Sequence, residues 1–268
     1  MAEPKLRAAC SWARSAKRPR VTAYATMSAY RGAMQPVDFE AFGALTFDCY
    51  GTLIDWEAGL LAAAGPIVAA HGVRIGDGEL LEAYARHSSA LEAGPYLTYR
   101  EVLGRSLVGL GAELGFEPTA QEITAFSGSV GDWPAFEDSP GALADLKRRF
   151  RLGVITNCDD DLFALSERRL GIDFDWVVTA RQAGAYKPDS RGFALAFERI
   201  DVARERILHV AQSLYHDHVT AKALGMTTVW VDRRGDKGGF GATPAAEATP
   251  DLTVPDMRTL AELAGASA

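Results

Sequence analysis

Six side chains able to attack, neutralise or hydrogen-bond a substrate stand at or beyond the ends of short apolar runs in this sequence. Each run is four or five residues long, as expected for a buried strand. The carboxyl ends of parallel strands share one edge of a sheet, so such groups converge although they lie far apart in the sequence. A carboxylate with an ammonium and hydroxyls beside it suits nucleophilic catalysis. The candidate groups are Asp48, Thr52, Thr156, Asn157, Lys187 and Asp217.

Asp48 has the most specific surroundings of the six. It follows the apolar run 44–47, and Gly51 breaks the pattern three residues later, which predicts a buried strand and a tight turn. An aspartate at this position lies where open α/β sheets bind their ligands. For this short stretch alone, an aspartate that only caps the strand explains the pattern equally well.

The rest of the chain divides into a helical part and an alternating part. Residues 57–131 are mostly helical, and the clearest helix covers 79–92, with Arg86 on the face opposite its apolar stripe. A second helical stretch runs near 99–114. From residue 139 onward, apolar runs alternate with helical patterns, which is typical of a parallel sheet. The strands expected there are 152–155, 176–179, 207–211 and 228–231.

These patterns predict an α/β fold, a doubly wound parallel sheet with a small helical cap domain inserted after the first strand. Residues 39–58 and 134–268 would form the core domain, and residues 59–133 the cap. Residues 1–38 are basic and show no core-forming pattern. We predict that they are a disordered or mis-annotated leader; an organellar transit peptide is the alternative, but a well-placed apolar face is missing.

The composition is that of an ordinary globular protein, with 48% hydrophobic and 24% charged residues among 268. The net charge of −7 argues against nucleic acid or an anionic membrane as a partner. No apolar stretch approaches the roughly 18 residues that a membrane span requires. Three cysteines give neither a disulfide framework nor paired zinc ligands, which fits a reducing cytosol. We expect a cytoplasmic protein with a small-molecule substrate, and leave a homodimeric state open.

The string Phe-Asp-Cys-Tyr-Gly-Thr-Leu-Ile-Asp at 47–55 changes the interpretation of Asp48. With Thr156, Lys187 and Asp217 in this order and spacing, it resembles the four motifs of the haloacid dehalogenase superfamily over about residues 43–232. In that superfamily the first aspartate of the string is the nucleophile. The superfamily includes phosphatases and dehalogenases, so the fold leaves the reaction open. The Asp-x-Tyr-Gly-Thr-Leu pattern is similar to that of L-2-haloacid dehalogenases.

Two positions depart from the superfamily's phosphatases. Tyr50 stands where those enzymes have a second aspartate that acts as general acid and base. Gln212 stands where they have an aspartate that helps to hold Mg²⁺, and an amide is a poor substitute for a carboxylate around this ion. We therefore expect no metal and no organic cofactor, although Asp48 and Asp217 leave weak metal binding open.

The resemblance implies that Asp48 attacks the halogen-bearing carbon of a short L-2-haloacid, and that water hydrolyses the resulting ester to a 2-hydroxy acid. Thr52 and Thr156 would hydrogen-bond the nucleophile and the substrate carboxylate. Lys187 would keep Asp48 ionised, because an opposite charge lowers a carboxylate pKa. Asp217 would position Lys187 or the hydrolytic water.

The resemblance also implies contacts with the substrate and the halide. Asn157 matches the halide-binding asparagine of the second motif, and Arg86 is our candidate for the family's cap arginine, with a merely solvated role equally open. Further candidates for substrate contact are Tyr50, Gln212 and Ser213.

Two other functions remain possible alternatives at this point. A Mg²⁺-dependent phosphatase of the same fold is disfavoured by Tyr50 and Gln212, and a catalytically weak binding protein is disfavoured by the retention of Asp48, Lys187 and Asp217. The fourth motif lacks the dehalogenases' Ser-x-Asn arrangement, and a phenylalanine replaces their tyrosine six residues after Lys187. These departures bear on substrate range and rate.

Overall fold

The computed structural model of this chain describes residues 37–235 and 246–266. The predicted leader therefore lies almost wholly outside the described residues, and its nature stays a prediction. Residues 36–268 belong to one compact unit. No described helix combines the length and the apolarity that a membrane crossing demands.

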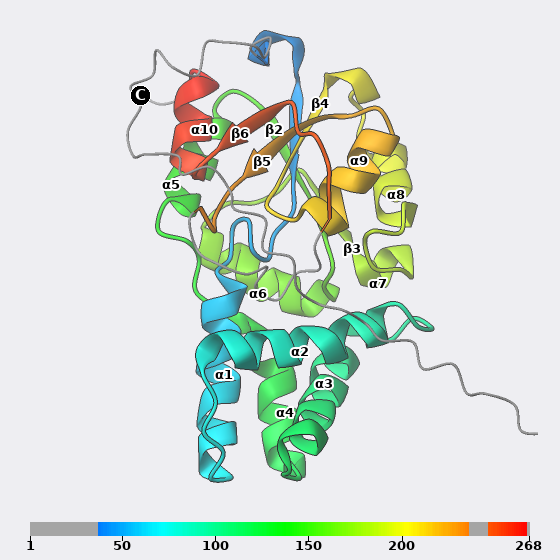
Figure 1. Cartoon of the computed structure of the whole chain (residues 1–268). Helices are drawn as coiled ribbons and strands as arrows, with labels where there is room; N and C mark the ends of the chain where they lie inside the picture. The colour runs from blue at the N-terminus through cyan, green and yellow to red at the C-terminus, as the bar shows by residue number, and fades with distance from the viewer. Residues whose placement is uncertain (1–36, 236–245, 267–268) are drawn as a thin grey trace, which may run out of the picture. The chain divides into compact units, whose positions relative to one another are not determined.

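A six-stranded parallel sheet forms the centre of this unit (Figure 1), which confirms the predicted fold class. The strand order is β3-β2-β1-β4-β5-β6, so the direction of winding reverses beside β1. In open α/β sheets such a reversal opens a crevice at the carboxyl ends of the strands. The strands are β1 (Ala44–Phe47), β2 (Arg151–Thr156), β3 (Trp176–Thr179), β4 (Ile207–Ala211), β5 (Thr227–Val231) and β6 (Leu252–Val254).

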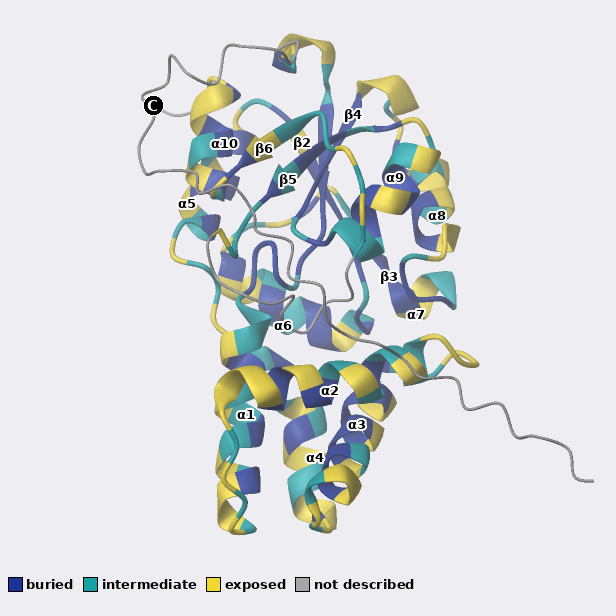
Figure 2. Ribbon diagram, viewed as in Figure 1, coloured by how far each residue is buried: buried dark blue, intermediate teal, exposed yellow. Residues whose placement is uncertain are grey.

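Alternate residues of the strands enter two separate apolar layers, because successive side chains of a strand point to opposite faces. Leu45 and Phe47 join the larger cluster, which includes residues of α5 (Ser139–Lys147) and α10 (Met257–Leu263). Ala44 joins the smaller cluster with residues of α8 (Arg191–Arg199). β1 and β4, at the centre of the sheet, are wholly buried between these layers, whereas β3 and β6 at its edges are partly exposed (Figure 2). β6 and α10 were not predicted.

Charged residues and a glycine explain where α6, one of the remaining core helices, begins and ends. α6 (Asp160–Leu170) begins with acidic residues, ends with arginines and is closed by Gly171 in the left-handed conformation. α7 (Ala180–Ala183) and α9 (Val219–Ala223) are short, and a single π-helical turn, η5 (Leu214–His218), precedes α9.

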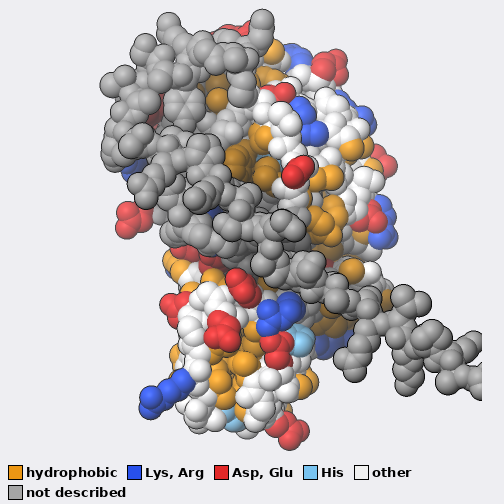
Figure 3. All heavy atoms as spheres, viewed as in Figure 1, with side chains coloured by type: hydrophobic (Ala, Val, Ile, Leu, Met, Phe, Trp, Pro, Cys, Tyr) orange, Lys and Arg blue, Asp and Glu red, His pale blue; other side chains and the backbone are white. Residues whose placement is uncertain are grey.

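Four helices lie between β1 and α5 in the sequence, as predicted for an inserted helical cap. They are α1 (Trp56–Ala70), α2 (Asp77–Glu92), α3 (Tyr99–Leu114) and α4 (Ala120–Gly128), followed by the 3₁₀ turn η3 (Ser129–Asp132). α3 has the predicted bounds, because Thr98 and Glu101 form a capping box at its start. The predicted domain boundaries themselves stay a prediction. On the face shown in Figure 3, described acidic, basic and apolar side chains are interspersed.

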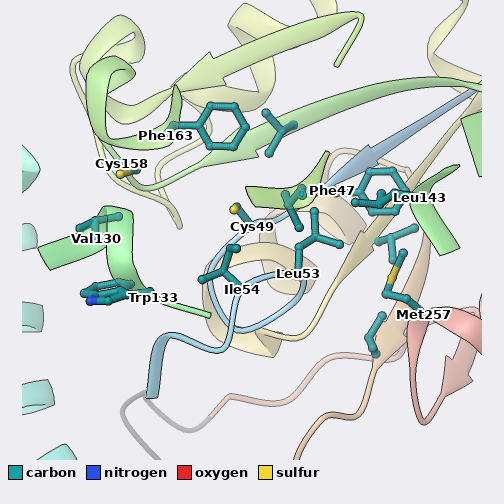
Figure 4. Close-up of a cluster of buried hydrophobic side chains, with 14 of the residues drawn as sticks. Phe47, Cys49, Leu53, Ile54, Val130, Trp133, Leu143, Cys158, Phe163 and Met257 are labelled. Atoms are coloured by element: carbon teal, nitrogen blue, oxygen red, sulfur yellow. The ribbon is translucent and has the colours of Figure 1, made fainter. Parts of the chain in front are cut away.

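The chain leaves and re-enters the core through two paired segments. The Asp55 N–H donates to Pro134 O (2.8 Å), and the Phe136 N–H donates to Leu53 O (3.1 Å). Trp133, beside this crossing, is fully buried with Ile54 in the cluster of Figure 4. The crossing is therefore a packed part of the core rather than a free linker.

Gly59 allows Trp133 to occupy this place, and the contact gives a test of the fold. A Cβ on Gly59 would overlap the Trp133 ring, so Gly59→Ala should lower the free energy of unfolding by about 1–3 kcal/mol. Gly78→Ala, in the first turn of α2 where a Cβ meets open space, is the matched control and should leave stability unchanged or slightly higher. Thermal unfolding measures both; equal effects would contradict the packing.

Candidate active site

The turn after β1 holds Asp48 at the winding reversal of the sheet. The Asp48 N–H donates to Val210 O of β4 (3.0 Å), which extends the sheet by one residue. Gly51 has a φ of +94°, a conformation that strongly favours glycine, and the turn brings Thr52 back to the aspartate. The Thr52 hydroxyl donates to Asp48 Oδ2 (2.7 Å) and accepts from the Gln212 N–H (2.9 Å). One carboxylate oxygen of Asp48 is thus held by the first and fourth motifs together.

Lys187 holds the other oxygen of Asp48 and is itself fully coordinated. Its ammonium donates to Asp48 Oδ1 (2.8 Å), Asp217 Oδ1 (2.6 Å) and Ile155 O (2.8 Å). An ammonium has three donors, so every one is used. Lys187 is only 4% exposed, and both carboxylates are buried as well.

Asn157 fixes the loop that presents Lys187. The Lys187 N–H donates to Asn157 Oδ1 (2.7 Å), and the Asn157 amide donates to Lys187 O (3.1 Å). The Asn157 side chain therefore positions the backbone of Lys187. The predicted contact with a halide would have to use its remaining N–H.

His209, which sequence reasoning missed, completes the site behind Asp217. Its Nε2 lies 3.1 Å from Asp217 Oδ1, and its Nδ1 lies 3.0 Å from the Thr46 hydroxyl. A carboxylate only accepts hydrogen bonds, so Nε2 carries a proton and donates it to Asp217. A histidine inside the apolar strand Ile207–Ala211 was the signal available in the sequence.

The electrostatics of the cluster differ from the simple expectation for Asp48. Burial raises the pKa of Asp48, and although Lys187 lowers it, the negative Asp217 adds to the increase, so the net direction is upward. Burial also pushes the pKa of Asp217 up, but Lys187 and His209 outweigh it and hold that pKa below its ordinary value. Burial lowers the pKa of Lys187, yet the two carboxylates raise it above its usual range. The sequence-based reasoning had neglected the desolvation of Asp48.

Two buried oxygen atoms at the site have no hydrogen-bond partner among the described residues. They are Thr156 Oγ1, at the end of β2, and Asp217 Oδ2. Ser213 is used locally, because its hydroxyl accepts from the His216 N–H (2.9 Å) at the start of η5. Thr156 and Asp217 therefore retain free hydrogen-bonding capacity for a substrate or a water.

Tyr50 is directed toward the cap and the second motif. Its hydroxyl is hydrogen-bonded to the Ser166 hydroxyl (2.9 Å), and Cys158 Sγ donates to it (3.4 Å). Its ring stacks on Tyr99 of α3 and meets Trp133 edge-on. Tyr50 thus joins core and cap through aromatic packing.

Arg86 is not brought to the cluster. It is exposed on α2, and its guanidinium pairs with Glu113 of α3. A contact with a bound halide would require Arg86 to leave this ion pair.

A cavity of about 310 Å³ opens on Lys187 from the side of the cap. It is bounded by the last turn of α2 and by the loop before α8. Its wall includes a second residue that sequence reasoning missed, Glu92, the last residue of α2. Nothing in the sequence beyond an acidic residue at a helix end pointed to it.

The donor set suits a magnesium ion poorly. No group of three or more His, Cys, Asp or Glu side chains with metal-binding geometry occurs among the described residues. The Lys187 ammonium lies between Asp48 and Asp217, and Tyr50 is turned toward Ser166. We therefore derive no step through a metal.

Comparisons with known proteins identify the family of this chain. The sequence model for haloacid dehalogenase-like hydrolases matches residues 42–225, which span Asp48, Lys187 and Asp217. This chain belongs to that family. An (S)-2-haloacid dehalogenase from Pseudomonas sp. (strain YL) is 26% identical over 231 residues, or 82% of this chain and 93% of that protein.

This chain is also similar to a phosphatase in sequence and to a dehalogenase in structure. A phosphoserine phosphatase from Thermus thermophilus is 32% identical over 198 residues, covering 69% of this chain and 74% of that protein. The crystal structure of the L-2-haloacid dehalogenase from Xanthobacter autotrophicus superposes with a TM-score of 0.69 at 20% identity, covering 85% of this chain and all of that chain. These similarities show the family and leave the reaction within it open.

The buried ammonium can be tested through stability. Lys187→Met leaves two buried carboxylates without their counter-ion, which should lower the free energy of unfolding at pH 8 by about 3–5 kcal/mol. The loss should be smaller at pH 5, because the carboxylates then take up protons in the folded variant more readily than in the unfolded chain.

Urea unfolding at the two pH values measures this loss. Lys147→Met, which removes a more exposed ion pair with Asp175, is the control and should cost about 1 kcal/mol or less. If Lys187→Met loses no more free energy of unfolding than Lys147→Met does, charge attraction does not stabilise the buried cluster.

Proposed function

We propose that this hydrolase removes the halogen of short L-2-haloacids through an ester on Asp48, without a metal ion. The observation that carries the proposal is the double restraint of the nucleophile. Asp48 Oδ1 is bound by the Lys187 ammonium and Oδ2 by the Thr52 hydroxyl, so the carboxylate is oriented at the crevice of the sheet. Orientation of a nucleophile before reaction removes much of the entropic part of a barrier.

In the first step an oxygen of Asp48 bonds to C2 of the substrate as the carbon–halogen bond breaks. The halide leaves with the bonding electron pair, and the configuration at C2 inverts. A halide requires no proton to leave, so the absence of a second aspartate at Tyr50 is compatible with this step. Thr156 Oγ1, which has no partner among the described residues, is available to the substrate carboxylate.

In the second step water attacks the carbonyl carbon of the Asp48 ester. Asp217 Oδ2 is buried and without a hydrogen-bond partner in the described part of the chain, so it is the available acceptor for the proton of this water. His209 and Lys187 hold the other oxygen of Asp217 and fix the carboxylate in place. The ester C–O bond then breaks, and the alkoxide of the 2-hydroxy acid takes up the proton held by Asp217. The second proton of the water is released to solvent as Asp48 returns to the carboxylate.

The cluster also suits an anionic substrate better than a site with further carboxylates would, because its net charge is less negative. Two aspartates and one lysine leave a charge of −1 when all are ionised. Two unit charges 4 Å apart repel by about 4 kcal/mol at an effective dielectric of 20. Tyr50 and Gln212 in place of aspartates remove two such repulsions.

A Mg²⁺-dependent phosphatase is the second candidate, and the similarity to the Thermus thermophilus phosphoserine phosphatase is the observation that favours it. Tyr50 and Gln212, which stand where those phosphatases have aspartates, disfavour it. The two candidates differ in product and in metal dependence.

Halide release from L-2-chloropropionate tests the proposal. We expect release by the full chain in the presence of EDTA, and a rate at least about 10³-fold lower for Asp48→Asn, which lacks the nucleophile. Phosphate release from p-nitrophenyl phosphate with Mg²⁺ is measured in parallel. Phosphate release that EDTA abolishes, with no halide release, would overturn the proposal in favour of the phosphatase.

A further inference from the structure

Glu92 faces Lys187 across the cavity between α2 and the loop before α8. Both residues line this space of about 310 Å³, together with Tyr96 and Tyr186, whose rings stack with 5.5 Å between centroids. The Tyr186 hydroxyl donates to Leu97 O (2.9 Å), which ties the core side of the cavity to the cap. The wall of the cavity on the cap side is thus joined to the core by a hydrogen bond and a ring contact.

The Glu92 carboxyl is placed where its ionised form is unfavourable. It ends α2, where the negative end of the helix dipole disfavours a carboxylate, and the last turn of α2 has no basic residue. Within residues 37–235 and 246–266, no group donates a hydrogen bond to Glu92. Burial raises the pKa of Glu92 to about 8, although the Lys187 ammonium opposes this increase.

Three tyrosines near Glu92 are neutral at neutral pH. Burial raises the pKa values of Tyr84, Tyr99 and Tyr186, and neighbouring acidic groups add to this increase. These phenols therefore stay protonated.

On the opposite wall of the cavity, burial lowers the pKa of His216 to about 4, so that its imidazole is uncharged. Asp189 and Arg191 also line the cavity and pair with each other (3.1 Å). Among the described residues of the wall, Glu92 is therefore the group whose charge changes between pH 6 and 9.

We propose that Glu92 is a catalytic residue that contacts the substrate from the cap, opposite Lys187, and that its carboxylic acid donates a hydrogen bond to the substrate's carboxylate. This inference rests on the proposed 2-haloacid substrate. A carboxylic acid adds a donor without adding a charge, whereas a carboxylate at this place would raise the negative charge of the site from −1 to −2. The neutral acid would thus serve the anion on the cap side, where Arg86 is engaged by Glu113.

The proposal predicts a pH dependence with a definite sign. kcat/KM for L-2-chloropropionate should fall above pH 8, approaching about tenfold per pH unit, because ionised Glu92 repels the anion. Glu92→Gln keeps an N–H donor that does not titrate, so it should keep activity within about tenfold at pH 7 and lose the alkaline fall. Glu92→Ala should raise KM about tenfold or more at pH 7, because the donor is gone.

Glu82→Gln is the matched control, since it makes the same chemical change at an exposed position of the same helix. It should retain the alkaline fall of the unmodified enzyme. A Glu92→Gln variant that still shows this fall, or that loses as much activity as Glu92→Ala, would overturn the assignment. Equal losses of activity in Glu92→Gln and Glu92→Ala would indicate that the Glu92 carboxylate acts as a base.

Binding of propionate, an unreactive carboxylate, provides a readout that does not need dehalogenation. By calorimetry, the unmodified chain should bind propionate at pH 6 and at least about tenfold more weakly at pH 9.5, and Glu92→Gln should bind it equally at both. Absence of binding at pH 6, or the same pH dependence in Glu92→Gln, would contradict the role of Glu92. If propionate binds with the expected pH dependence but no halide is released, the proposed function is rejected. The contact of Glu92 with a bound carboxylate would then still stand.

Discussion

The structure of the site depends on one ammonium group that is buried between two carboxylates. Lys187 donates all three of its hydrogen bonds within the protein, and two of the acceptors are Asp48 and Asp217. Unpaired charges at this depth would cost several kcal/mol each, so the strand ends that carry these groups must converge closely. The parallel sheet meets this requirement by placing β1, β2 and β4 side by side. The close approach of these three charged groups is therefore required by both the fold and the chemistry.

The cap extends the same site by closing it and by changing its polarity. Tyr50 stacks on Tyr99 of α3 and contacts Trp133, so the turn after Asp48 packs against the cap. Glu92 and Tyr96 then form a wall opposite Lys187. A substrate in this cavity would meet a cation on the core side and, on our proposal, a neutral acid on the cap side. This division would let a negatively charged cluster accept an anion.

Several features could be predicted from the sequence because they depend on local pattern. Apolar runs ending in polar residues located the strands, and the order of Asp48, Lys187 and Asp217 indicated the family. The rest depended on tertiary contacts that no local pattern encodes. The ion pair of Arg86 with Glu113 joins two helices, so it depends on how these helices pack. The apolar strand around His209 gives no indication of the contact that this residue makes with Asp217. The raised pKa of Asp48 reflects its burial, a tertiary property that a local pattern does not contain.

The most direct test of the account is the origin of the hydroxyl oxygen in the first molecule of product. In a single turnover of L-2-chloropropionate in ¹⁸O-labelled water, with enzyme in excess, the 2-hydroxy acid should be unlabelled because its oxygen comes from Asp48. The label should appear in the Asp48 peptide, and only later turnovers should yield labelled product. Label in the first product would mean that water attacks C2 directly. Asp48 would then be a general base, contrary to the covalent mechanism.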